Sequence, residues 1–190
     1  LQSLRLDLIE LLMRVAVEPG AATADPIMFL GAVDQAAYTY TPALTSHTFE
    51  NLRATGDLRL IRSDEVKDIL FDYYGFDNEQ RQYRPLQFET ESRHFELAAG
   101  VLSNAQATFI QDQWLFFRPN NIDEIRNTEI AVDGIDDAAM RLQAKAELVE
   151  WLPYVRSMQL EQIEVHEARL QRARSALDSL TKYADQIRRL

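Results

Sequence analysis

The first and last segments of this 190-residue chain carry apolar residues at heptad spacing, and this pattern constrains the fold more than any other feature. In residues 1–17 the repeat comprises Leu1, Leu4, Leu8, Leu11 and Val15. In residues 163–190 one apolar series alternates with a second, mainly apolar one: Ile163, Leu170, Leu177 and Ala184, then His166, Ala173, Leu180 and Ile187. Such a stripe needs a facing helix to bury it. The chain is therefore expected to form a helical bundle with long first and last helices.

The composition favours an all-α fold. The chain contains six Gly and six Pro, too few for the turns of an all-β protein. Apolar residues make up 46% and charged residues 26%, as in globular proteins. We expect a single helical domain over residues 1–190, an elongated antiparallel helical bundle with more than about 65% helix. The first and last helices should pack lengthwise against each other and bury Leu8 and Leu170.

Capping residues indicate where some helices begin and end. Asp25 followed by Pro26 predicts the start of one helix, and Ser63 predicts the start of another. Gly56 stands where a left-handed residue would close a short helix that begins after Ser46. These signals predict helices on both sides of a short connection at residues 57–61.

The last helix raises a question of length. Residues 119–136 look like an irregular connection, and a helix from there to the last residue would span roughly 80 Å. A compact domain of this size cannot contain such a helix. We therefore expect Pro153 to kink it, because proline removes a helical hydrogen bond.

Charge and motifs exclude several classes of function. The net charge of −10 argues against a nucleic-acid partner, because phosphates are bound by clustered Lys and Arg. The chain has no Cys, which removes disulfides, thiolate metal sites and cysteine nucleophiles. Every Gly is isolated, so no phosphate-binding loop is present. No segment reaches the ~18 apolar residues of a membrane span. The sequence predicts no cofactor and no catalytic residues.

One spacing is compatible with a metal site. Glu91 and His94 form a Glu-x-x-His sequence, which di-iron bundles place on facing helices. Such a site needs the motif twice, and neither His47 nor His166 has a Glu three residues before it. We therefore interpret Glu91 and His94 as part of a solvated helix face and predict no metal.

A stretch near the first third of the chain resembles a known pattern. Residues 48–74 contain a short helix that ends in Thr-Gly, an aliphatic segment and a helix with paired tyrosines: Phe49, Leu52, Gly56, Leu58, Ile61, Tyr73 and Tyr74. This motif resembles an uncharacterised bacterial family in which one N-terminal transmembrane helix precedes a helical bundle domain. The resemblance implies a bacterial protein with a membrane anchor upstream of residue 1, and it implies no activity.

These observations favour a non-enzymatic, membrane-tethered helical domain that works in protein interaction or signalling. The chain would then be the soluble part of a longer membrane-anchored protein, on an undetermined side of the membrane. The alternative is a four-helix-bundle domain that senses a small ligand, as in chemoreceptors, with the aromatic residues around Tyr73, Tyr74 and Trp114 as pocket material rather than core.

The length of the last stripe favours a homodimer through the last helix. The first helix offers only ~25 Å of partner surface, whereas the last helix is ~55 Å long. The middle helices are the alternative cover for the remainder. In a dimer His166, at a core-type position, would set the register or respond to pH.

Overall fold

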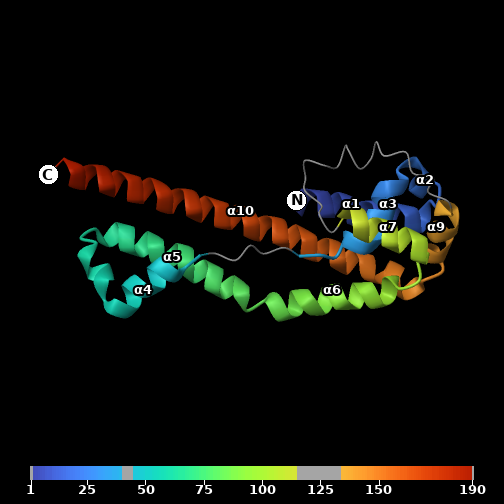
Figure 1. The fold of residues 1–190 in the computed structure, drawn as a ribbon, viewed down its shortest axis with the longest axis horizontal. Helices are drawn as coiled ribbons and strands as arrows, with labels where there is room; N and C mark the ends of the chain where they lie inside the picture. The colour runs from blue at the N-terminus through green and yellow to red at the C-terminus, as the bar shows by residue number, and fades with distance from the viewer. Residues whose placement is uncertain (1, 40–44, 115–133, 190) are drawn as a thin grey trace. The chain divides into compact units, whose positions relative to one another are not determined.

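The computed structural model describes residues 2–39, 45–114 and 134–189 (Figure 1). It is 84% helical, and the described ranges contain no strand. The all-α helical bundle with long first and last helices is thereby confirmed. The elements are α1 (Gln2–Val17), α2 (Ala21–Ala24), α3 (Pro26–Gln35), α4 (His47–Thr55), the 3₁₀ helix η1 (Asp57–Leu60), α5 (Asp64–Arg81), α6 (Arg84–Ala98), α7 (Asn104–Trp114), α9 (Ile135–Gln143) and α10 (Ala146–Arg188).

The chain divides into two compact units. Unit 1 contains residues 1–40 and 86–163, and unit 2 contains residues 41–85 and 164–190. Helix α10 contributes its first part to unit 1 and its remainder to unit 2. No change of composition marks the boundary at 163.

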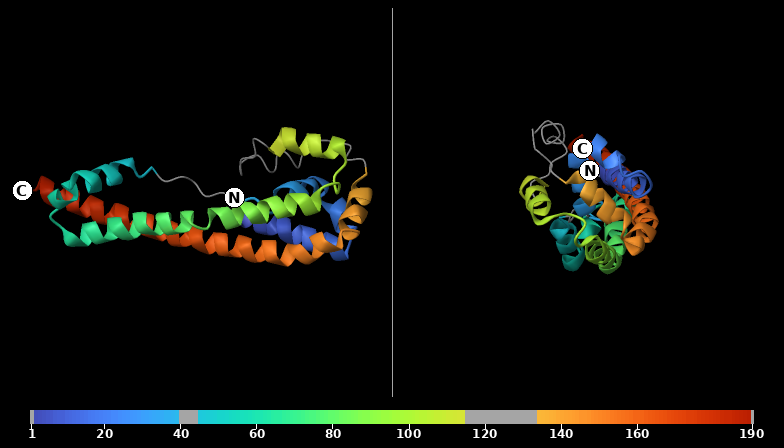
Figure 2. Two further views of the ribbon diagram at one scale, coloured as in Figure 1. Left: turned by 90° about the horizontal axis from the view of Figure 1, so that it is seen from below. Right: turned by 90° about the vertical axis from the view of Figure 1, so that its right-hand side faces the viewer.

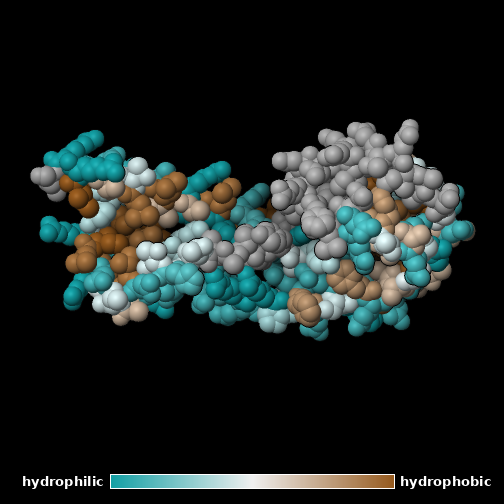
Figure 3. Space-filling view, in the orientation of Figure 1, coloured by the Kyte–Doolittle hydropathy of each residue, from teal (hydrophilic) through white to brown (hydrophobic). Residues whose placement is uncertain are grey.

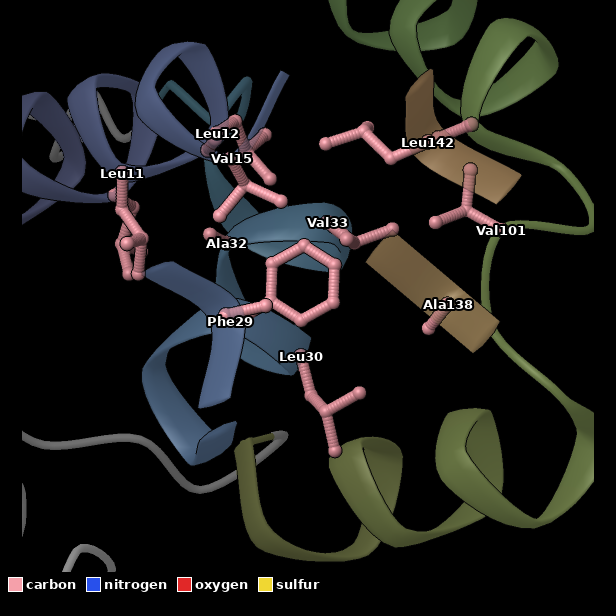
Figure 4. Close-up of a cluster of buried hydrophobic side chains, with 14 of the residues drawn as sticks. Leu11, Leu12, Val15, Phe29, Leu30, Ala32, Val33, Val101, Ala138 and Leu142 are labelled. Atoms are coloured by element: carbon pink, nitrogen blue, oxygen red, sulfur yellow. The ribbon is translucent and has the colours of Figure 1, made fainter. Parts of the chain in front are cut away.

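Unit 1 is organised around α3, which is apolar on all sides. All residues from Ile27 to Val33 are buried, as expected for a helix inside a core. Helix α3 packs against α1 and α7, and α1 also packs against α9. Figure 4 shows the ring of Phe29 among side chains from α1 and α9. Within the described residues the stripe of the first helix faces this core as predicted, with Leu8, Leu11 and Val15 buried and Leu4 half-buried.

Side-chain amides complete the ends of two helices in unit 1. The Gln143 amide donates to the carbonyls of Val15 and Ala16, at 3.3 and 3.2 Å, near the end of α1. The buried Gln159 amide donates to the carbonyls of Ala36 and Tyr38, at 2.9 and 3.1 Å, just beyond α3. Because the last carbonyls of a helix lack partners within it, these bonds remove a cost of burying them.

The caps predicted at Asp25, Ser63 and Gly56 are present, whereas Ser46 precedes α4 without a capping hydrogen bond from its side chain. The Asp25 carboxylate accepts the Met28 N–H, with Pro26 in the first turn of α3. The Ser63 hydroxyl accepts the Val66 N–H at 3.3 Å and begins α5. Gly56 closes α4 at φ 76°, a left-handed conformation that glycine adopts without steric strain.

Two expectations about the last helix are wrong. Helix α10 continues through Pro153, which therefore does not end the helix as expected, and Leu152 and Val155 on either side are buried in the core of unit 1. The break instead falls at residues 144–145, between α9 and α10. In the expected lengthwise packing Leu170 was to be buried, but it belongs to unit 2 and is exposed.

Among the described helices, none combines the length and the apolar character needed to cross a membrane. The connection expected at residues 119–136 lies almost entirely outside the described residues.

Candidate interaction surface

Much of the apolar stripe of α10 is exposed in unit 2, although Ala173 is half-buried. The exposed fractions are 51% for Leu170, 65% for Leu177, 39% for Leu180 and 53% for Ile187. Apolar surface gathers over α10 and the neighbouring helices of unit 2 in Figure 3. Large apolar side chains that repeat along one face of a helix are unfavourable in water, so the stripe is a candidate binding site for a partner.

In unit 2 the buried residues of α10, Arg169 and Ala176, each come one residue before an exposed leucine of the stripe. Lettering the heptad a to g with Leu170 and Leu177 at a places Arg169 and Ala176 at g, where both are buried, and half-buried Tyr183 at the next g. The Tyr183 hydroxyl accepts the N–H of Arg62 at 2.8 Å. These contacts turn the g side of α10 towards its own unit and leave the a positions outward.

An ion pair holds this orientation. Arg169 Nη2 lies 3.0 Å from an Asp77 carboxylate oxygen, and the two side chains are only 8% and 6% exposed. Arg81 Nε donates to the other Asp77 oxygen at 2.9 Å. Because a buried charge without its partner is costly, the pair favours one rotation of α10 against α5 more than it adds net stability.

A second arginine reinforces the contact between α5 and α10. Arg172 Nε lies 3.1 Å from Asp72, and the guanidinium carbon stands 4.2 Å from the centre of the Phe76 ring. A guanidinium over an aromatic face is favourable, more so where water is partly excluded. Asp72, Phe76 and Asp77, on successive turns of α5, thus contact two arginines of α10 that stand three residues apart.

The motif of residues 48–74 forms the small apolar core behind this contact. Phe49 and Leu58 are buried in one cluster with Val66 and Leu70, and the half-buried members of the cluster include three further motif residues and one from α10: Leu52, Ile61, Tyr74 and Tyr183. The Phe49 and Tyr74 rings are stacked at 4.2 Å. The motif therefore supports α10 in unit 2.

Tyr73 lies at the edge of that core. Its ring meets the Tyr74 ring at 5.0 Å, edge to face. Partial burial raises the pKa of the Tyr73 hydroxyl, and the neighbouring Tyr74 acts in the same direction. Tyr73 therefore stays neutral at physiological pH.

The structure gives Glu91 and His94 structural contacts, and the interpretation of a solvated helix face is wrong for His94. His94 is fully buried, and its Nε2–H donates to the Val33 carbonyl at 3.1 Å. Burial lowers the pKa of this imidazole, although the bond to Val33 acts in the opposite direction. The half-buried Glu91 carboxylate accepts the backbone N–H and the hydroxyl of Thr39. No group of three acidic or histidine side chains suited to a metal occurs among the described residues.

A groove lies between α6 and the first part of α10 in unit 1, where the two helices run side by side (Figures 1 and 2). It has a volume of about 480 Å³. Its lining combines two aromatic rings with charged side chains: Leu86, Glu89, Thr90, Ser92, Arg93, Glu96, Trp151 and Tyr154. Arg93 pairs with Glu96 at 3.4 Å and with Glu147 at 3.2 Å, so the rim is already partly neutralised.

Sequence reasoning missed the residues that orient the surface. Asp77, Arg169 and Tyr183 attract no attention in the sequence, because two are charged and one stands in a helix without other aromatics nearby. The available signal was the heptad position g, which Arg169, Ala176 and Tyr183 share. His166, predicted at a core-type position, is half-buried in α10.

Comparison with protein-family models, with curated proteins and with solved structures finds no match for this chain.

Proposed function

We propose that this chain is a non-enzymatic interaction domain that pairs with a second copy of itself through the α10 stripe of unit 2. The observation that carries the proposal is the exposure of four large apolar side chains at heptad positions: Leu170, Leu177, Leu180 and Ile187. The ion pairs and aromatic contacts on the other edge of α10 support it, because they keep the stripe facing outward.

Pairing is energetically plausible. Full burial of a leucine or isoleucine side chain contributes about 1.5–3 kcal/mol, and roughly half of each stripe residue is still exposed. Two copies bring eight such side chains together. The gain competes with the loss of translational and rotational freedom, which costs at least about 4 kcal/mol. A reversible dimer is the expected result.

Light scattering tests this proposal. The chain of residues 1–190 is expected to shift towards dimer as its concentration rises to high micromolar. The double variant Leu170→Glu/Leu177→Glu should remain a monomer, because it places charge in the stripe. Ser175→Glu is the matched control, since Ser175 is an exposed residue of α10 outside the stripe. A wild-type chain that stays monomeric throughout would refute the proposal.

The proposal includes a tether at a bacterial membrane, upstream of residue 1. Its support is the resemblance of residues 48–74 to a family with such an anchor. Confinement to a membrane would raise the local concentration of the domain and favour a weak dimer. Fractionation of the native bacterium tests the tether. The protein should sediment with membranes, resist a high-salt wash and be released by detergent. Recovery in the unsedimented fraction would exclude it.

The groove of unit 1 favours a second candidate, a ligand-sensing domain. The Trp151 and Tyr154 rings, with Glu89 at the same groove, suit a small organic cation, while Arg93 pairs with Glu96. Tetramethylammonium is a simple probe, and Trp151 fluorescence is a suitable signal. A saturable change that Tyr154→Ala weakens and Ser175→Glu leaves intact would support this function, and a lack of saturation would exclude it for this class of ligand.

A further inference from the structure

We infer that the two copies pair antiparallel, with Leu177 of each α10 opposite Leu180 of the other. This inference rests on the proposed self-association and names its geometry. The starting point is the order of side-chain sizes along the stripe. From Leu170 to Ile187 the order is large, small, large, large, small, large, with Ala173 and Ala184 as the small residues. The series reads the same from either end, with its midpoint between Leu177 and Leu180.

A palindromic stripe is self-complementary when one helix is reversed. In the reversed register Leu170 faces Ile187 of the second copy, and Ala173 faces its Ala184. Core positions a and d alternate across an antiparallel pair in this way. The paired segment covers residues 167–188, about 33 Å of helix. All of it belongs to unit 2.

A parallel pair would match residue sizes equally well, so charge must decide. The e positions beside the stripe on the side away from g are Glu167, Arg174, Thr181 and Arg188. In the antiparallel register e meets e, which places Glu167 of each copy beside Arg188 of the other and Arg174 beside Thr181. Glu167 and Arg188 are both exposed. Arg188 also makes a long ion pair with Asp185 at 3.7 Å, but this exposed contact holds it weakly.

The parallel arrangement lacks these ion pairs. There e meets g of the second copy, so Arg174 would approach the partner copy's residue 169, which is also an arginine. Glu167 and Arg188 would face Gln162 and Tyr183, neither of which carries the opposite charge. Arg169 is buried and its charge is balanced by Asp77, so it adds little repulsion. The parallel pair is instead disfavoured because it lacks the Glu167–Arg188 ion pairs, and opposed helix dipoles add a small preference for the antiparallel pair.

Cysteine cross-linking tests the register directly, because the chain has no native Cys. Ala173→Cys and Ala184→Cys are nearly isosteric changes. In the antiparallel register residue 173 of one copy lies opposite 184 of the other. Residue 184 lies about 16 Å along the axis from its own equivalent, beyond the reach of a disulfide. An oxidised mixture of the two single variants should therefore give the covalent heterodimer, and each variant alone should give little.

A charge exchange provides the second measurement. Glu167→Arg and Arg188→Glu should each weaken the dimer about tenfold, because each change affects two symmetric pairs. The double variant should recover most of the wild-type affinity, which a merely structural effect would not produce. Arg174→Glu serves as the control, since Arg174 faces Thr181.

The outcomes separate the inference from the proposed function. Efficient cross-linking of Ala184→Cys with itself would show a parallel pair and overturn the inference, with self-association intact. A dimer that gives no cross-link in the mixture would place the interface elsewhere and also overturn it. A chain that never dimerises would refute the proposed function itself.

Discussion

The two units of this protein reach a stable interior by different means. Unit 1 surrounds an entirely buried apolar helix, α3, and uses polar side chains mainly to complete the ends of α1 and α3. In the described part of unit 2 the core cluster contains four buried apolar residues, and the unit also uses stacked rings and a buried ion pair. The comparison suggests that unit 1 is the scaffold and that unit 2 has apolar surface left to share with a partner.

Helix α10 shows this difference within a single element. In unit 1 it buries Leu148, Leu152 and Val155, whereas in unit 2 it buries Arg169 and Ala176. Its leucines and Ile187 in unit 2 remain exposed. Helices of isolated domains normally bury leucine and expose charged side chains, and α10 in unit 2 does the reverse.

The largest effect on this comparison is expected from a substitution at the centre of the unit 1 core. Phe29→Ala should destabilise the protein by about 3–5 kcal/mol, because the fully buried ring leaves a cavity that the neighbouring helices cannot fill. Urea unfolding followed by circular dichroism measures the change. Phe71→Ala, at a ring 47% exposed in unit 2, is the control and should cost far less. Equal losses at the two positions would mean that unit 1 is not the better packed.

The ion pair of unit 2 provides the next test. Asp77→Ala should cost about 3–4 kcal/mol, because Arg169 would stay buried without its partner. The joint change Asp77→Leu/Arg169→Met should cost much less, since both charges leave together. Thermal unfolding of the three proteins measures the difference. If the single and the joint changes were equally harmful, the charge argument would fail.

A smaller effect is expected from pH in unit 1. Burial lowers the pKa of His94 from its ordinary 6.5, so the unfolded chain binds a proton more readily than the folded one. The stability from neutral His94 is complete above 6.5 and is lost as the pH falls towards the folded-state pKa. The unfolding temperature should therefore drop between pH about 7.5 and about 5.

His94→Gln isolates this contribution, because an amide can still donate to the Val33 carbonyl and does not titrate. Its pH dependence should be shallower than that of the wild type. His47→Gln, at an exposed position in α4, is the matched control substitution. Identical slopes in wild type and His94→Gln would assign the pH dependence to other groups.

Gly56 allows a test of the short connection in unit 2. Gly56→Ala should cost about 1–2 kcal/mol, because alanine is strained at φ 76°. No atom lies within 4 Å of the added Cβ, so the cost is conformational and not steric crowding. Gly75→Ala is the natural control, since the added methyl there also meets nothing within 4 Å and helical alanine is favoured. Chemical unfolding should show the two changes with opposite signs.

The smallest effect is expected at the stripe. Leu170→Ala should change the stability of the monomer by only about 1 kcal/mol, because half of the side chain is already exposed. Leu8→Ala, at a fully buried position of α1, should cost about 2–5 kcal/mol. Unfolding at low concentration, where the dimer is absent, gives both values. A large loss at Leu170 would show that the stripe is part of a core after all.

Much of the fold could be predicted from the sequence, because local signals have local causes. The helix starts at Asp25 and Ser63 and the end at Gly56 follow from side-chain and backbone geometry that three or four residues determine. The stripe of α1 was also predicted as core, and it is. For the caps, the capping residue and the backbone group that it serves lie close together in the sequence. For α1, the apolar repeat itself requires burial.

The candidate surface could be predicted only in part. Periodicity reveals that Leu170 and Leu177 share a face of a helix, but it does not reveal which element covers that face. The burial of Arg169 and His94 depends on Asp77 and Val33, which lie 92 and 61 residues away in the chain. Long-range pairs of this kind leave no trace in a single sequence. The division of α10 between two units was missed for the same reason.

The buried pair of Asp77 and Arg169 has an evolutionary consequence. A change at either position alone leaves an isolated charge inside unit 2, so selection should remove most lineages that lose only one partner. The two positions are therefore expected to covary, with both charges kept, both exchanged or both replaced by apolar residues. Glu50 and Arg53 form an exposed pair, so the two positions are under no such constraint and should vary independently. An alignment of homologues should therefore show correlated substitutions at positions 77 and 169, which reflect the orientation of α10.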